Sequence, residues 1–231
     1  MKRGSFTLTE NRILKPDVHL LRFCGDSSAI LRSGQFVQIE LPDCYLKRPF
    51  SVCDWDDHGF SIIVETAGSG TAQLLSTPEG MVFSVLTGLG NGFTPPPGSG
   101  EGLLLVGVGT GLSPMVGLAA RHPQAKVLLA FRSLESAFGK DLFPGHSVLI
   151  TTDLLSDLST IPHSFFCACG SEAAMRAVSL GDPVCGQIAF DVRMGCGFGA
   201  CMGCTRKTVH GYARVCKEGP VFWKEELLWE D

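Results

Sequence analysis

The chain has 231 residues, of which 45% are hydrophobic and 18% are charged. This balance allows a well-buried core and argues against an intrinsically disordered chain. The net charge of −4 and the isoelectric point near 5.9 give no sign of a protein that binds nucleic acid or an anionic membrane. The length is enough for two or three small domains.

The sequence carries no recognisable export or membrane segment. Its Met-Lys-Arg start is not followed by an apolar stretch, and no run of 18 apolar residues occurs anywhere. Ten cysteines in a chain of this length are better explained as reduced thiols and metal ligands than as a disulfide framework. We therefore expect a soluble cytoplasmic protein with no membrane and no nucleic-acid partner.

Residues 1–97 have the pattern of an all-β domain. Short apolar or alternating runs separated by turn signals predict strands at 5–9, 18–23, 36–41, 49–53, 60–66 and 82–86. One short helix is expected at 71–75. Strands at this spacing indicate a small antiparallel barrel or sandwich.

A Pro- and Gly-rich linker at 94–100 marks a change of pattern. Beyond it, strands are expected at 103–106, 127–131, 148–152 and 165–169, and helices at 112–121, 134–142 and 172–180. This alternation predicts a Rossmann-like open parallel sheet. The predicted organisation is multidomain β plus α/β: an antiparallel β-barrel domain at 1–97, an α/β domain at 98–186 and a cysteine-containing module at 187–231.

The cysteine module has the most specific signal in the chain. Four cysteines follow the spacing C-x4-C-x2-C and then, after eleven residues, a fourth: Cys196, Cys201, Cys204 and Cys216. The spacing of the first three cysteines matches the plant-type ferredoxin pattern for a [2Fe–2S] cluster, and the interspersed glycines allow the backbone to approach the sulfides. Structural zinc is the competing interpretation, but it favours two C-x2-4-C pairs. Unliganded cysteines are the third alternative.

Two short segments of the β domain are candidates for a phosphate-bearing ligand. Arg48, Pro49, Phe50 and Ser51 combine a cation, a fixed φ and a hydroxyl at the start of a strand. Gly70 and Thr71 lie where a helix begins, and exposed N–H groups there can bind pyrophosphate oxygens. The alternatives are a strand edge with a solvated arginine and an ordinary turn with a threonine cap.

Two segments of the α/β domain are candidates for a dinucleotide. Gly107, Gly109, Thr110 and Gly111 follow a buried strand and open a helix, as a dinucleotide loop requires. Cys169 ends another strand, at the edge of the sheet where ligands bind, and could touch a nicotinamide. The alternatives are a plain glycine-rich turn and a buried cysteine before a helix.

Taken together and in order, these segments resemble the electron-transfer subunit family of NAD-dependent (class 1B) dihydroorotate dehydrogenase. The resemblance covers nearly the whole chain and includes residues 90–93, 193–196 and 215–222. The cysteine spacing is its specific part, whereas the flavin and nucleotide segments are shared with the wider ferredoxin–NADP reductase superfamily.

The resemblance implies an FAD-binding barrel, a nucleotide-binding domain for NAD(H) and a C-terminal [2Fe–2S] module. It places FAD contacts on the segments already named and adds Ile63, Val64 and Glu65. Electrons would pass between NADH, FAD, the cluster and an FMN-containing dihydroorotate dehydrogenase catalytic subunit, in a hetero-oligomer expected to be a heterotetramer. The overall reaction would be the oxidation of dihydroorotate to orotate in pyrimidine biosynthesis.

Two features depart from the family pattern. The family commonly has a basic residue where this chain has Glu65, and an acid cannot bond a phosphate, so any contact there is expected through the backbone. Residues 153–163 form a shorter, glycine-free segment that points to a trimmed nucleotide domain. Two further functions stay open at this point: a reductase subunit of a hydrogenase, sulfur reductase or transhydrogenase-like complex, and a redox-sensing module without turnover.

Overall fold

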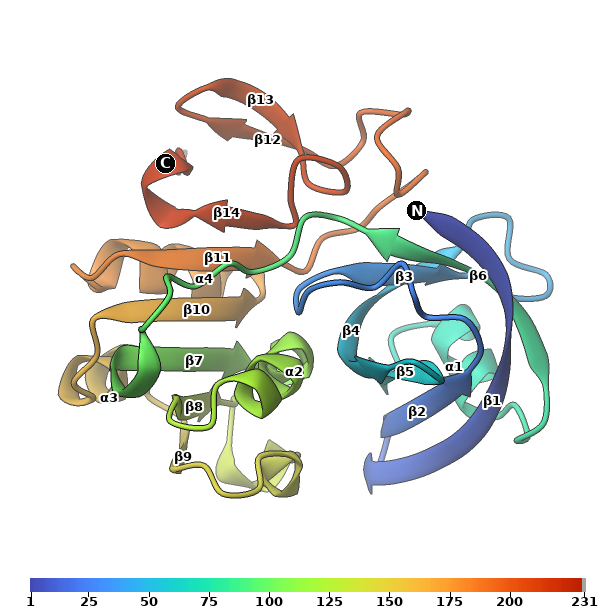
Figure 1. Cartoon of the computed structure of the whole chain (residues 1–231), viewed down its shortest axis with the longest axis horizontal. Coiled ribbons are helices and arrows are strands. Elements are labelled where there is room, and N and C mark those ends of the chain that lie inside the picture. The colour runs from blue at the N-terminus through green and yellow to red at the C-terminus, as the bar shows by residue number, and fades with distance from the viewer. Residues whose placement is uncertain (230–231) are drawn as a thin grey trace.

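The computed structural model describes residues 1–229. Its N-terminal part is a closed antiparallel barrel with strand order β1-β2-β5-β4-β3-β6 (Figure 1). Phe23 in its centre stacks on Phe60 at 5.3 Å between ring centroids, and Phe6 meets Phe60 edge-on. The barrel elements are β1 (Lys2–Lys15), β2 (Val18–Cys24), β3 (Phe36–Ile39), β4 (Arg48–Asp56), β5 (Gly59–Glu65), helix α1 (Ser69–Leu75) and β6 (Val82–Leu89).

The second part is a six-stranded sheet with the order β14-β11-β10-β7-β8-β9. The five strands from β11 to β9 are parallel, and only β14 is antiparallel to its neighbour. The elements are β7 (Leu103–Val108), α2 (Ser113–Arg121), β8 (Lys126–Ala130), β9 (Val148–Thr151), α3 (Leu154–Thr160), β10 (Phe165–Gly170), α4 (Glu172–Gly181), β11 (Gly186–Phe190) and β14 (Val221–Trp223). The strand order reverses between β7 and β10, which is where ligands bind in such sheets.

The C-terminal part lies above both of the others in Figure 1. It consists of the cysteine loop, the hairpin β12 (Thr205–Thr208) and β13 (Gly211–Arg214), and β14, which pairs with β11. The predicted boundary at 186/187 therefore falls inside β11, and the division into domains stays a prediction. None of the helices in residues 1–229 is both long and apolar enough to cross a bilayer.

Helix α2 joins the sheet to the barrel. Its Gly117 approaches β4 so closely that a methyl group there would lie 2.7 Å from the carbonyl oxygen of Cys53. At the end of the helix, the Arg121 guanidinium lies 3.6 Å from the centroid of the Trp55 ring and donates to Asp54 at 2.9 Å. These contacts fix the parallel sheet against the wall of the barrel.

One helix expected from the sequence is absent. Residues 134–142, predicted as a helix, form two separate 3-10 turns, Leu134–Ser136 and Lys140–Leu142. Gly139 between them has a left-handed φ of 76°, which interrupts a right-handed helix. The segment expected to be trimmed, 153–163, still contains a helix, α3, capped by the Asp153 side chain on the N–H of Ser156.

Candidate functional site

The glycine-rich loop and Cys169 meet at the switch point of the sheet. Cys169 of β10 is in register with Gly107 of β7, and the loop continues into a short 3-10 turn at Gly109–Leu112. A methyl group on Gly107 would lie 2.6 Å from the Cα of Leu112. This glycine therefore lets the chain turn back on itself, as a strand–helix turn at a ligand site requires.

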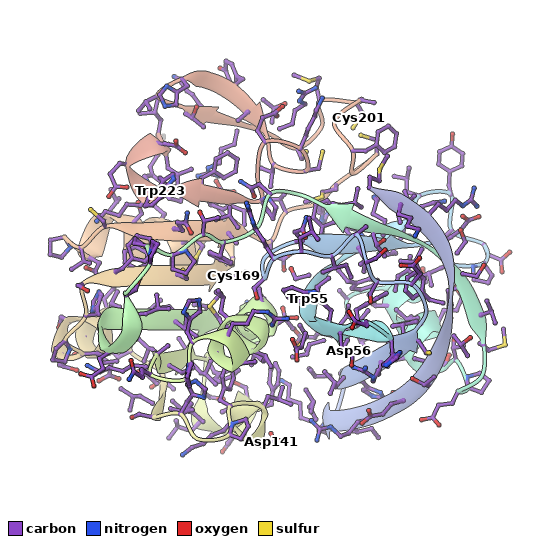
Figure 2. All side chains as sticks on the ribbon, viewed as in Figure 1. Trp55, Asp56, Asp141, Cys169, Cys201 and Trp223 are labelled. Carbon is purple, nitrogen blue, oxygen red and sulfur yellow. The ribbon has the colours of Figure 1, made fainter. Side chains whose placement is uncertain are left out.

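Cys169 is almost fully buried at this junction, between the sheet and the barrel (Figure 2). Burial raises the pKa of its thiol far above the ordinary value, so it is protonated at neutral pH. A protonated, buried thiol is a poor nucleophile. A contact between Cys169 and a nicotinamide stays a prediction. The burial of the thiol favours a packing role for Cys169 over a role as an acid or base.

A cavity of about 260 Å³ brings the candidate residues of the two domains together. One wall comes from the barrel and the other from the sheet. This cavity explains why segments as far apart in sequence as Pro49 and Asp191 can serve one ligand. Its lining includes ten residues predicted from the sequence: Pro49, Phe50, Ser51, Ile63, Val64, Glu65, Thr71, Thr110, Gly111 and Cys169. Asp191, which was not predicted, also lines it.

Arg48 and Gly70, from two separate candidate segments, lie side by side. A methyl group on Gly70 would be 3.0 Å from the Nε of Arg48, whose Nη1 donates to the carbonyl oxygen of Leu46 at 2.6 Å. Thr71 serves its own turn, because its hydroxyl accepts from the N–H of Ala67 at 2.8 Å and of Gly68 at 3.1 Å. Arg48 is thus held beside the start of α1, while Thr71 acts as a cap.

A second cavity of about 450 Å³ lies at the carboxyl ends of the parallel strands. It is lined by Gly109 and Thr110 from the loop after β7 and by Gly170 and Ser171 from the end of β10. Arg132, just after β8, lines it too. Glu65 belongs to both cavities, so the acid at this position lies between the two candidate ligand sites.

Asp191 is a residue that the sequence analysis missed. It follows β11 directly, its N–H donates to the carbonyl oxygen of Gly170, and it lines both cavities. The residue is exposed at the surface, but protein atoms crowd its carboxyl group. The resulting desolvation raises the pKa of the carboxyl. The sequence around Asp191 contains no motif that would have identified it as a site residue. Its position follows only from the pairing of β11 with β10.

The four predicted cluster ligands form two pairs. The Cys201 thiol donates to the sulfur of Cys196, and the Cys216 thiol donates to the sulfur of Cys204. Among residues 1–229, no three His, Cys, Asp or Glu side chains are arranged to hold one metal ion. Two pairs suit a dinuclear [2Fe–2S] cluster, in which each iron takes two cysteines, better than a single zinc ion.

Backbone N–H groups surround the sulfurs in the way that a negatively charged cluster requires. Cys196 Sγ accepts from the N–H of Ala200 at 3.2 Å and of Cys201 at 3.4 Å, and Cys204 Sγ accepts from the N–H of Cys216 at 3.4 Å. Burial opposes ionisation of Cys196, but these donors and the N–H of Phe198 outweigh it and lower its pKa to about 6. The donor set therefore fits thiolate ligands.

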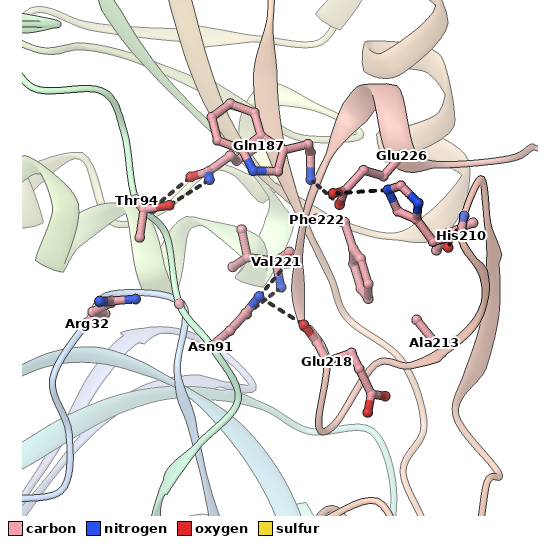
Figure 3. A pocket seen from close by; sticks show the side chains of 13 residues that line it. Arg32, Asn91, Thr94, Gln187, His210, Ala213, Glu218, Val221, Phe222 and Glu226 are labelled. Atoms are coloured by element: carbon pink, nitrogen blue, oxygen red, sulfur yellow. Dashed lines mark hydrogen bonds and ion pairs between the residues drawn. The ribbon is translucent and has the colours of Figure 1, made fainter.

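Two polar contacts fix the cysteine module to the rest of the chain (Figure 3). The Asn91 side chain donates to the carbonyl oxygens of Glu218 and Val221 and accepts from the N–H of Val221. The Gln187 amide exchanges two hydrogen bonds with Thr94, at 2.8 and 2.9 Å. Both surround a cavity of about 410 Å³ that shares no residue with the two already described.

Comparison with known proteins agrees with this geometry. Residues 191–228 match the family model of the iron–sulfur cluster binding domain of dihydroorotate dehydrogenase B. The electron transfer subunit of dihydroorotate dehydrogenase B (NAD(+)) from Caldanaerobacter subterraneus subsp. tengcongensis is 32% identical over 219 aligned positions, covering 85% of this chain and 87% of that protein. The chain belongs to this family. Its member from Bacillus pumilus is 30% identical, with 98% of each chain covered.

Solved structures show that the fold is that of the ferredoxin–NADP reductase group. An NADH-dependent reduced ferredoxin–NADP oxidoreductase superposes with a TM-score of 0.84 at 23% identity, covering 97% of this chain and 90% of that one. Phthalate dioxygenase reductase gives a TM-score of 0.61 at 14% identity, covering 89% and 71%. The predicted fold class, a barrel, a Rossmann-like sheet and a C-terminal iron–sulfur module, is confirmed.

Proposed function

We propose that this chain relays electrons between a nicotinamide cofactor and a partner flavoenzyme, through FAD and a [2Fe–2S] cluster of its own, in the oxidation of dihydroorotate. When bound, FAD exchanges a hydride with NAD(H) and passes electrons singly to the cluster. In this proposal, the residues of this chain hold the three groups next to one another.

One observation carries the proposal: Pro49, Phe50 and Ser51 face two cavities at once. On one side they line the 260 Å³ cavity with Thr110, Gly111 and Cys169. On the other side they line a cavity of about 30 Å³ with Val192 and Met194, which lead directly into Cys196. A flavin held by this segment would lie between a nicotinamide and the cluster loop.

The proposed residue roles follow from these positions. FAD would contact Arg48, Pro49, Phe50 and Ser51, the β5 residues Ile63, Val64 and Glu65, and Gly70 and Thr71. NAD(H) would occupy the 450 Å³ cavity along Gly109 and Thr110, with Gly107 and Gly111 shaping the loop. Cys196, Cys201, Cys204 and Cys216 would hold the cluster, and Cys169 would pack near the nicotinamide.

The partner we propose is a separate catalytic subunit that contains FMN, assembled with this chain as a heterotetramer. Relatives of this chain are named electron transfer subunits of dihydroorotate dehydrogenase B, a name that implies a catalytic partner. The substrate would therefore react on the partner.

Anaerobic titration of the purified chain tests this function. NADH should bleach a flavin absorbance and produce the EPR signal of a reduced [2Fe–2S] cluster, whereas dihydroorotate should do neither until the catalytic subunit is added. Reduction of the FAD by dihydroorotate in the isolated chain would overturn the division of labour. Protein that contains zinc and no iron would overturn the relay itself.

A further inference from the structure

Gln38 is a buried polar residue without a visible purpose in the barrel. It lies on β3, in register with Pro49 of the flavin segment, and its side chain is 1% exposed. The other residues of β3, Phe36, Val37 and Ile39, are apolar. Neither the Nε2 nor the Oε1 of Gln38 has a hydrogen-bond partner among residues 1–229.

The amide group of Gln38 rests against the cluster loop. A methyl group on Gly197 would lie 2.2 Å from its Nε2 and 2.7 Å from its Oε1. The amide therefore occupies the space that any other side chain at position 197 would need. Gly197 has a φ of 74°, follows Cys196 directly, and belongs to the loop whose N–H groups converge on the Cys196 sulfur.

A buried amide without hydrogen bonds is costly. It loses its hydrogen bonds to water without replacing them, and a leucine or methionine at this strand position would avoid the loss. An amide aimed at a cysteine loop has a natural acceptor in the sulfurs of a cluster, because bound thiolates and sulfides accept N–H hydrogen bonds. Such bonds stabilise the more negative, reduced form and so raise the reduction potential.

We propose that Gln38 is a hydrogen-bond donor that the barrel contributes to the cluster: its Nε2–H donates to sulfur at the Cys196 end of the cluster and raises the cluster's reduction potential. This inference rests on the proposed function, because it requires the cluster. It also links the flavin segment to the cluster loop through one strand, since the backbone of Gln38 pairs with Pro49.

The test uses the purified full-length chain with its cofactors, and compares Gln38→Met, Gln38→Glu and Gln187→Met by dye-mediated redox titration monitored by EPR. Gln187 is the matched control, because it is equally buried but its amide is fully paired with Thr94. We expect Gln38→Met to lower the reduced-to-oxidised ratio at a fixed potential about tenfold, a shift of about −59 mV. Gln38→Glu, which removes the donor and adds a carboxyl, should lower it at least as far.

The melting temperature of the iron-free protein provides the second readout. Gln38→Met should leave it unchanged or raised, whereas Gln187→Met should lower it and leave the cluster potential unchanged. An unaltered potential and EPR spectrum in both Gln38 variants would overturn the proposal, as would an iron-free Gln38→Met protein that melts as low as Gln187→Met. If the Gln38 variants fold normally but lose iron while Gln187→Met retains it, a direct contact with the cluster is supported. Wild-type protein without iron would refute the proposed function as well.

Discussion

The glycine loop and the Cys169 strand touch at one point: a methyl group on Gly111 would lie only 2.2 Å from the carbonyl oxygen of Cys169. The Cα of the next residue, Gly170, would lie 2.8 Å from the same methyl group. Because both neighbours are backbone atoms of a central strand, neither can move aside cheaply. Gly111 thus lets the dinucleotide loop lie directly on β10. The two candidate nucleotide-binding segments, this loop and the end of β10 at Cys169, therefore lie at the same edge of the sheet.

Gly111→Ala should therefore destabilise the protein and weaken nicotinamide binding. Overpacking of this kind costs about 1–3 kcal/mol, and a rigid backbone contact puts it at the upper end. Gly109→Ala is the control, since Gly109 has a φ of 56° and open space around it, so the change should cost only about 1 kcal/mol. Urea unfolding compares the stability of the two variants, and equal losses of stability would contradict the assigned contact. NADH titration of Gly111→Ala measures the loss of nicotinamide affinity.

Arg48→Ala should weaken FAD binding about ten- to a hundredfold. A charge-assisted bond to the pyrophosphate contributes about 1.5–3 kcal/mol, which corresponds to that change in affinity. Arg3→Ala is a suitable control, because Arg3 lies on the same barrel and pairs with Glu40 and Ser84 at the surface. Fluorescence titration of the flavin-free protein measures the affinity, and an unchanged value would show that Arg48 merely braces Leu46.

Cys201→Ser should remove the cluster and leave FAD in place. Cys201 is exposed, lies apart from Cys169 in Figure 2, and is not among the residues that line the flavin cavity. Cys24→Ser, at another exposed cysteine, should retain both cofactors. Iron analysis and the flavin absorbance of each purified variant check the result. Loss of flavin together with iron from a folded Cys201→Ser protein would mean that the two sites depend on each other.

Asp191→Asn should make the protein more stable at neutral pH. Desolvation raises the folded-state pKa of Asp191, so between its unfolded and its folded pKa the folded protein binds more protons than the unfolded chain. Stability contributed by this group therefore falls as pH rises through that window, which lies above the ordinary value of 3.8. The Asp191→Asn protein should not show this decline in stability with rising pH. Thermal melts from pH 4 to pH 8 would contradict the assignment if both proteins changed in parallel.

The local sequence was sufficient to identify the chemistry of this protein. Three of the four proposed cluster ligands come from one tight loop, so the spacing of Cys196, Cys201 and Cys204 is itself the signal. The loop at Gly107–Gly111 was also recognisable, because the strand before it and the helix after it are adjacent in the chain. The barrel strands followed from alternating hydrophobicity for the same reason: period-2 burial is a property of neighbouring residues.

Only the tertiary structure decided which of these segments share a cavity and which further residues belong there. Asp191 and Gln38 acquire their positions from strand pairs that are distant in sequence: β11 pairs with β10 across 20 residues, and Gln38 of β3 pairs with Pro49 of β4 across 11. No neighbouring residue in the sequence indicates either position. The residues 134–142 have helical periodicity, yet the left-handed Gly139 divides them. Strand β14 belongs to the cysteine module but pairs with β11 at the edge of the parallel sheet. A three-residue strand is too short to show a hydrophobic pattern in the sequence. It forms here because the exposed edge of β11 offers hydrogen-bonding groups to pair with.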